Sequence, residues 1–238
     1  MTSSLAVPPP FPRRIGVFGG AFDPPHVAHV ALAKAAVAQF ALDRLMVLPT
    51  GQAWHKIRSL TASRHRLAMA QLTFGSLPKT DVDDREIRRD GPTYTIDTLV
   101  QLQAENPMAQ LYLVIGADQA CALMAWHRWE ELLRIAIISV AVRFSDREAK
   151  LAVAVAKAYS GPLPNDFSLL VAGLPEPLQT QGRFELLQCP PMAVSATDVR
   201  HRVANGLESG PGGLGIADLV TAPVARYIAQ NHLYLAPR

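Results

Sequence analysis

The chain has 238 residues, of which 49% are hydrophobic and 18% are charged, and this is enough for a large α/β domain with a substantial core. Its 23 basic and 20 acidic residues give a net charge of only +3. Charge therefore gives no reason to expect a nucleic-acid or membrane partner, whereas a small anionic ligand is compatible with it. Because the sequence has no apolar run of membrane-spanning length, we expect a cytoplasmic protein.

The first 12 residues are rich in proline and lack the basic and apolar regions of a signal peptide. They predict a disordered tail, followed by a single domain over residues 13–238. The two cysteines, Cys121 and Cys189, lie far apart and form no CxxC pattern, so neither a zinc site nor a disulfide framework is indicated and we expect buried free thiols. The oligomeric state stays open, with a homo-oligomer as one alternative.

The first predicted unit is a strand, a glycine turn and a helix. The apolar run 15–18 ends at Gly19-Gly20, and apolar residues at helical spacing follow Asp23-Pro24-Pro25. Glycine lets backbone N–H groups approach an anion, and the helix N-terminus adds a partial positive charge. His26 and His29 would share one face of that helix. The glycine spacing is neither Rossmann nor P-loop, and we favour phosphate contacts for the histidines over structural roles, with a metal site third.

A second apolar run, 45–48, closes a parallel strand–helix–strand unit. The next loop carries His55 and Lys56, and it would face the ligand. Lysine is a flexible point charge suited to a moving phosphate, although a solvated surface lysine is the alternative. A helix with Thr61 as its N-cap is predicted to follow.

Further along, Gly91-Pro92 precedes a predicted helix that begins near Thr93 or Thr95 and presents Leu99 and Val100 on its apolar side. The runs 111–115, 135–142 and 184–187 predict further buried strands. Asp118 follows the first of these runs, and the carboxyl ends of parallel strands meet at one edge of a sheet. The pattern predicts an α/β fold, a Rossmann-like doubly wound parallel sheet with helices on both faces.

The last motif begins at Ser195, a predicted N-cap with Asp198 in the first turn of its helix, which Gly206 terminates. A terminal helix is predicted to begin at Pro223. Thr197 and Arg200 lie in the first of these two helices. A capped helix with a surface arginine is the plain structural alternative to phosphate binding there.

Three stretches together resemble a known family. Residues 19–29 are similar to the GGxFDPxHxGH signature of the nucleotidyltransferase superfamily, with Ala28 in place of the usual glycine. Residues 93–99 resemble the (S/T)YTxDTL element, and His55-Lys56 the lysine loop, of the nicotinate mononucleotide adenylyltransferase family. Residues 194–200 resemble the (I)SSTxIR signature, with Ala196 in place of a serine. The matches cover most of residues 14–232 in the family's order.

This resemblance implies adenylyl transfer from ATP to nicotinate mononucleotide in NAD biosynthesis, giving deamido-NAD and pyrophosphate. It implies Mg²⁺ bound through the ATP phosphates, without protein metal ligands. The implied catalytic residues are His26, His29, Lys56 and Arg200. The implied ATP-binding residues are Gly19, Gly20, Phe22, His26, His29, Asp118, Ser195, Thr197 and Arg200. The implied nicotinate mononucleotide-binding residues are Lys56, Thr93, Tyr94, Thr95, Trp126 and Arg143.

Two alternatives remain open at this point. The first is another enzyme of the superfamily, such as phosphopantetheine adenylyltransferase. Trp126 and the segment around Tyr94 argue against it, since a pyridine ring gives a reason for both. The second is a non-catalytic module that binds nucleotide or RNA. The weak net charge and the presence of both histidines, Lys56 and Arg200 argue against that.

Overall fold

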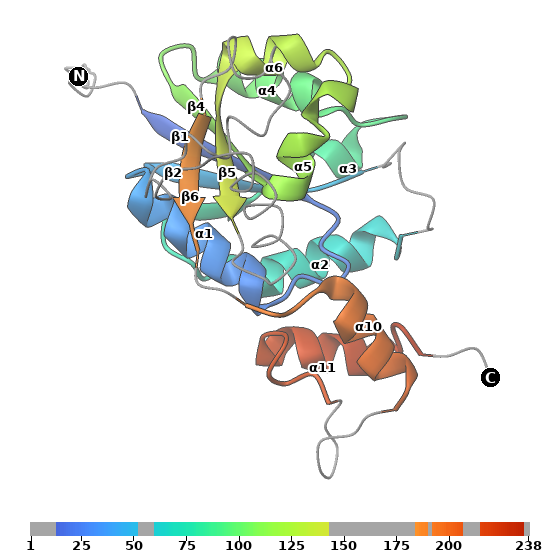
Figure 1. The fold of residues 1–238 in the computed structure, drawn as a ribbon. Coiled ribbons are helices and arrows are strands. Elements are labelled where there is room, and N and C mark those ends of the chain that lie inside the picture. The colour runs from blue at the N-terminus through green and yellow to red at the C-terminus, as the bar shows by residue number, and fades with distance from the viewer. Residues whose placement is uncertain (1–12, 52–59, 143–183, 190–191, 207–214, 236–238) are drawn as a thin grey trace, which may run out of the picture.

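The computed structural model describes residues 13–51, 60–142, 184–189, 192–206 and 215–235. Within these residues, parallel strands form one sheet in the order β3-β2-β1-β4-β5-β6 (Figure 1). This is the doubly wound order of a Rossmann fold, and the predicted fold class is confirmed. The strands are β1 Arg14–Gly20, β2 Arg44–Pro49, β3 Thr80–Val82, β4 Gln110–Gly116, β5 Ala136–Val142 and β6 Phe184–Gln188.

Helices cover both faces of the sheet. Their bounds are α1 Val27–Gln39, α2 Ser63–Phe74, α3 Arg85–Arg88, α4 Thr95–Glu105, α5 Ala117–Cys121, η1 Leu123–Ala125, α6 Trp129–Ile135, α10 Ala196–Ala204 and α11 Ala222–Gln230. None of the described helices is long and apolar enough to cross a bilayer.

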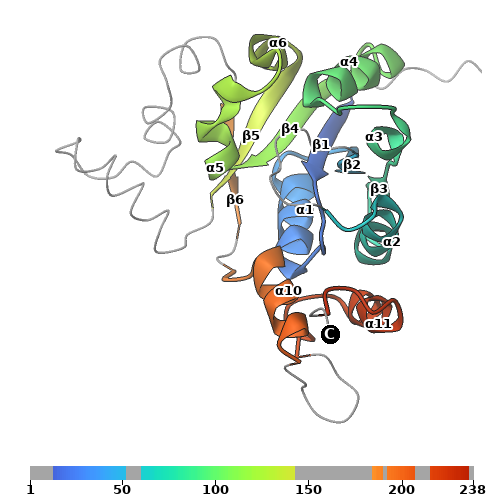
Figure 2. The same ribbon diagram turned by 90° about the vertical axis from the view of Figure 1, so that its right-hand side faces the viewer.

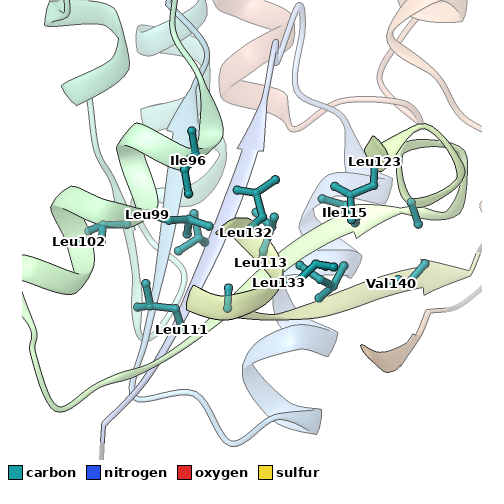
Figure 3. Close-up of a cluster of buried hydrophobic side chains, with 14 of the residues drawn as sticks. Ile96, Leu99, Leu102, Leu111, Leu113, Ile115, Leu123, Leu132, Leu133 and Val140 are labelled. Carbon is teal, nitrogen blue, oxygen red and sulfur yellow. The ribbon is translucent and has the colours of Figure 1, made fainter. Parts of the chain in front are cut away.

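The first face of the sheet is covered by α4, α5 and α6. Buried leucines and isoleucines of α4 and α6 pack there against alternate residues of β4 (Figure 3). The opposite face is covered by α1 and α2, whose side chains pack against Phe18 of β1, Tyr112 and Val114 of β4, and Leu187 of β6. The strands are therefore buried on both faces, which explains why β1, β4 and β5 read as nearly continuous apolar runs.

The two C-terminal helices lie beyond the end of the sheet toward which the strands point (Figures 1 and 2). A third apolar cluster joins Val199 of α10 and Val224 and Ile228 of α11 to Met69 of α2. The backbone N–H of Val27, at the start of α1, donates to the carbonyl of Leu219 over 2.9 Å. These contacts place α10 and α11 over the carboxyl edge of the sheet, where α/β proteins bind ligands.

Some local predictions were wrong. Strand β3 was not predicted, because Thr80–Val82 is three residues long and has no apolar run. The N-cap of α2 is Ala62 and not Thr61. Val100 of α4 is 43% exposed, although it was assigned to the apolar side. Cys189 was expected to be buried but is only half-buried. The predicted tail, residues 1–12, lies outside the described residues, and the single-domain boundaries stay a prediction.

Two neighbours on α4 provide a test of this packing. Leu99 is fully buried in the cluster of Figure 3, whereas Val100 faces outward. We expect Leu99→Ala to lower the free energy of unfolding by about 2–5 kcal/mol, since it removes buried methyl groups and leaves a cavity. Val100→Ala should change it by no more than about 0.5 kcal/mol. Urea unfolding of the two variants measures the difference, and equal losses would contradict the assigned packing.

Candidate active site

The loop from β1 to α1 turns sharply at the carboxyl edge of the sheet. Phe22 has a φ of +47°, in the left-handed region, and its ring is 2% exposed. It packs edge-on against Phe18 and Phe74, with ring centroids 5.4 Å away in both cases. This aromatic packing holds a backbone conformation that is unfavourable for a bulky residue. A Cβ added at Gly19 would meet no atom within 4 Å, so the strand end borders open space.

His26 and His29 lie together just after this turn. His26 is the N-cap of α1, and the two imidazole rings are stacked with centroids 3.7 Å apart. The backbone N–H of His26 donates to Nδ1 of His29 over 3.1 Å. Because Nδ1 accepts this bond, a neutral His29 carries its hydrogen on Nε2, which is then a donor. The shared placement is confirmed, and the phosphate contacts stay a prediction.

Ser195 caps α10 as predicted. Its hydroxyl accepts from the backbone N–H of Asp198 over 3.2 Å and donates to the Asp198 carboxylate over 2.6 Å. This bond from Ser195 holds the pKa of Asp198 below its ordinary value. The single hydroxyl hydrogen of Ser195 is thus committed to Asp198 in this structure. The donors that α10 offers to an anion are therefore its N-terminal backbone amides, the hydroxyl of Thr197 and the guanidinium of Arg200.

Arg200 connects α10 to the histidine loop, which is the connection between β1 and α1 (residues 21–26). Its Nη1 donates to the backbone carbonyl of Asp23 over 2.7 Å, and its Nη2 donates to the hydroxyl of Thr197 over 3.0 Å. Thr197 accepts this bond and keeps its own hydrogen for donation. The structure thus brings the first and last sequence motifs together, across 177 positions of chain.

The segment around Tyr94 lies at the start of α4. Thr93 is buried, Tyr94 is the N-cap and Thr95 is the first helical residue. The Tyr94 ring lies on His127, with centroids 4.2 Å apart and planes at 33°. Trp126 is half-buried and packs against the same apolar cluster as Tyr94. The segments around Tyr94 and Trp126, both assigned to the pyridine nucleotide, therefore lie together. His127, which was not predicted as a site residue, makes the ring contact between them.

Asp118 lies in the first turn of α5, directly after β4. Its side chain is exposed and accepts from the Gln119 amide over 3.0 Å. A Cβ at Gly116 would lie 2.6 Å from Oδ1 of Asp118, so glycine at 116 allows the carboxylate to lie back over the strand end. The structure thus places this carboxylate at the end of β4, the strand next to β1.

Two predicted site residues, Lys56 and Arg143, lie outside the described residues, as does His55. Arg66, a fully buried arginine of α2, was not predicted from the sequence as part of the site. Burial lowers the pKa of its guanidinium, and Asp23 and Tyr234 oppose that shift. The spacing in the sequence could have indicated its burial. Arg66 lies three and four positions before Met69 and Ala70, so all three residues share the buried side of the helix.

Comparisons with known proteins give one consistent result. The family model described as Cytidylyltransferase-like matches residues 17–202. A probable nicotinate-nucleotide adenylyltransferase from Albidiferax ferrireducens is 49% identical over 93% of this chain and 98% of its own length. Another from Methylibium petroleiphilum is 39% identical, over 95% and 94%. In fold, the chain is similar to a nicotinic acid mononucleotide adenylyltransferase of Plasmodium falciparum complexed with NaAD, with a TM-score of 0.67, 20% identity, and coverage of 93% and 97%.

Proposed function

Because the chain belongs to the nicotinate-nucleotide adenylyltransferase family, we propose that it transfers the adenylyl group of ATP to nicotinate mononucleotide. The products are deamido-NAD and pyrophosphate, and the reaction is a step of NAD biosynthesis. The observation that carries this proposal is the 49% identity, which extends over 93% of the chain. The stacked histidines and Arg200, gathered at the carboxyl edge of the sheet, give the proposal its chemistry.

The nucleophile in this reaction is the phosphate of nicotinate mononucleotide. Its second pKa of about 6 leaves it largely ionised near neutral pH, so no protein group needs to remove a proton. A phosphate oxygen attacks the α-phosphorus of ATP in line, a new P–O bond forms, and the bond to the β-phosphate bridging oxygen breaks. Pyrophosphate leaves with the electron pair. Catalysis therefore consists of positioning the reactants and stabilising negative charge.

The residues at the end of β1 are suited to that task. His26, His29 and Arg200 would hold the phosphates of ATP, together with Lys56 and the backbone amides at the start of α10. Arg200 is held from two sides, by the carbonyl of Asp23 and the hydroxyl of Thr197. A charge fixed in this way needs little reorganisation when negative charge develops on the leaving group.

The start of α4 would receive the pyridine ring. A helix N-terminus stabilises an anion, and here it would meet the nicotinate carboxylate at Thr93, Tyr94 and Thr95. Trp126 would offer an aromatic face to the ring. The Tyr94 ring contacts His127, with ring centroids 4.2 Å apart, and Trp126 is the proposed stacking partner. Preference for nicotinate over nicotinamide then follows from the charge of the carboxylate.

Mg²⁺ bound through the ATP phosphates is part of the proposal. Over the described ranges, no group of three or more His, Cys, Asp or Glu side chains could hold a metal ion. The phosphate site instead gathers imidazoles, a guanidinium and backbone amides, which suit phosphate oxygens rather than Mg²⁺. The ion would supply charge neutralisation on the phosphates while keeping several of its waters.

The test is pyrophosphate release from ATP and Mg²⁺ with three acceptors in parallel: nicotinate mononucleotide, nicotinamide mononucleotide and phosphopantetheine. We expect rapid release with the first, slower release with the second and none with the third. Chelation of Mg²⁺ should abolish release, and added Mg²⁺ should restore it. Release with phosphopantetheine alone would contradict the assigned acceptor. ATP binding without pyrophosphate release in the presence of any of the three acceptors would indicate a non-catalytic binding module.

A further inference from the structure

Asp23 joins the C-terminal segment of the described chain to the histidine loop. The Asp23 side chain is 2% exposed. Its Oδ1 accepts from the hydroxyl of Tyr234 over 2.7 Å, and its Oδ2 accepts from the backbone N–H of Thr61 over 3.2 Å. Its backbone carbonyl accepts from Arg200. The side chain of Asp23 is thus held by Tyr234 and Thr61. Its backbone carbonyl in turn holds Arg200, which belongs to the last motif.

Arg66 stabilises the same region through hydrogen bonds to three backbone carbonyls. Its Nε donates to the carbonyl of Thr61 over 2.8 Å, its Nη1 to that of Ala21 over 3.0 Å, and its Nη2 to that of Gly51 over 3.3 Å. Ala21 belongs to the histidine loop, and Gly51 and Thr61 lie close to either end of the segment that carries Lys56. A single buried guanidinium therefore sets the spacing of these backbone positions.

The backbone at this junction is held in an unfavourable conformation. Phe22, directly before Asp23, and both His232 and Tyr234 have positive φ, at +47°, +50° and +65°. None of them is glycine, so each conformation costs free energy that its surroundings must offset. Strain of this kind persists where contacts over-determine the structure, and the Tyr234–Asp23 bond is such a contact. The strained positions are thus Tyr234 itself and Phe22, the residue directly before Asp23.

The hydroxyl of Tyr234 remains a donor throughout the neutral range. Burial raises the pKa of this hydroxyl, and the carboxylate of Asp23 raises it further. The nearby side chain of Thr61 opposes part of this shift in pKa. The phenol therefore keeps its hydrogen on the bond to Asp23.

We propose that Tyr234 is a positioning residue for adenylyl transfer: its bond to Asp23 holds the carbonyl that orients Arg200 toward the phosphates of ATP. This inference rests on the proposed function. It assigns to Tyr234, which lies outside the three motifs, a role that acts through Asp23 and Arg200. Displacement of a charged group by a fraction of an ångström lowers turnover more than it lowers substrate binding, because the transition state is the more sensitive to geometry.

The first experiment compares two tyrosines near the C-terminus that each hydrogen-bond to an earlier part of the chain, Tyr234 to the loop between β1 and α1 and Tyr227 to α2. Tyr234→Phe removes the bond to Asp23, whereas Tyr227→Phe removes a 2.9 Å bond to Nδ1 of His65. We expect Tyr234→Phe to lower kcat by about tenfold with KM for ATP changed by less than about threefold. Tyr227→Phe should retain wild-type kcat. Thermal unfolding of both variants separates this effect from loss of stability.

A double-mutant cycle then identifies the route of the effect. If Tyr234 acts through Arg200, Tyr234→Phe should lower kcat by less than about twofold in the Arg200→Ala background. An equal loss in both backgrounds, or equal kcat for Tyr234→Phe and Tyr227→Phe, would overturn the inference. Inactive wild-type protein would overturn the proposed function itself, which distinguishes the two failures.

Discussion

His26→Ala is expected to lower kcat by about 100-fold or more, which is the effect of removing one preorganised donor to developing negative charge. The imidazole is 3% exposed and stacks on His29 at 3.7 Å. Its removal would therefore take away one proposed phosphate contact and the support for the ring of the other. Steady-state pyrophosphate release measures the loss, with ATP and nicotinate mononucleotide each varied in turn.

His26 also caps α1, so the alanine variant could lose activity through the helix instead. His26→Asn separates these effects, because asparagine is among the best N-cap residues and keeps a short polar side chain at that position. We expect it to unfold close to the wild-type temperature and to share the kinetic loss. His65→Ala serves as the histidine control, since His65 contacts Tyr227 of α11. Wild-type kcat in His26→Asn would contradict a phosphate-contacting role for the imidazole.

Local sequence patterns predicted the parts of the fold that depend on neighbouring residues. The apolar runs of β1, β4 and β5 are long because the sheet is covered on both sides. The start of α4, expected near Thr93 or Thr95, was predicted from the Gly91-Pro92 break, and the Ser195–Asp198 cap was predicted because capping involves residues three positions apart. Strand β3 could not be predicted in this way, because its three residues form a strand only by pairing with β2.

The connections within the site depend instead on contacts between distant parts of the chain. The bond from Tyr234 to Asp23 spans 211 positions, and Arg66 donates to three carbonyls that belong to two separate loops. No periodicity or spacing encodes such contacts, because a backbone carbonyl can accept from any donor that the fold brings to it. Resemblance to a family assigned roles to motif residues, but it did not indicate which buried residues hold the motifs in place.

Arg200→Ala is expected to lower kcat by about 100-fold, with pyrophosphate release as the readout. Two features of Arg200 give the reason: its fixed charge, and its position between Asp23 and Thr197. Arg202, on the same helix, is the matched control, since its Nη1 donates to the Gly215 carbonyl and to Asp218, where the ion pair is exposed. Such a surface pair contributes about 0–1 kcal/mol to stability. Arg202→Ala should therefore retain wild-type kcat.

Arg200→Lys shows which of the two features matters more. Lysine keeps the positive charge, but its ammonium group lacks the planar fork that lets Arg200 bond Asp23 and Thr197 simultaneously. If fixed orientation is essential, Arg200→Lys should lose most of the activity that Arg200→Ala loses. If charge alone is sufficient, Arg200→Lys should retain close to wild-type kcat. Added salt should then weaken ATP binding more in the lysine variant than in the wild type, because a mobile charge in solvent is screened more strongly. Equal losses for Arg200→Ala and Arg202→Ala would contradict a specific role for Arg200 in binding phosphate.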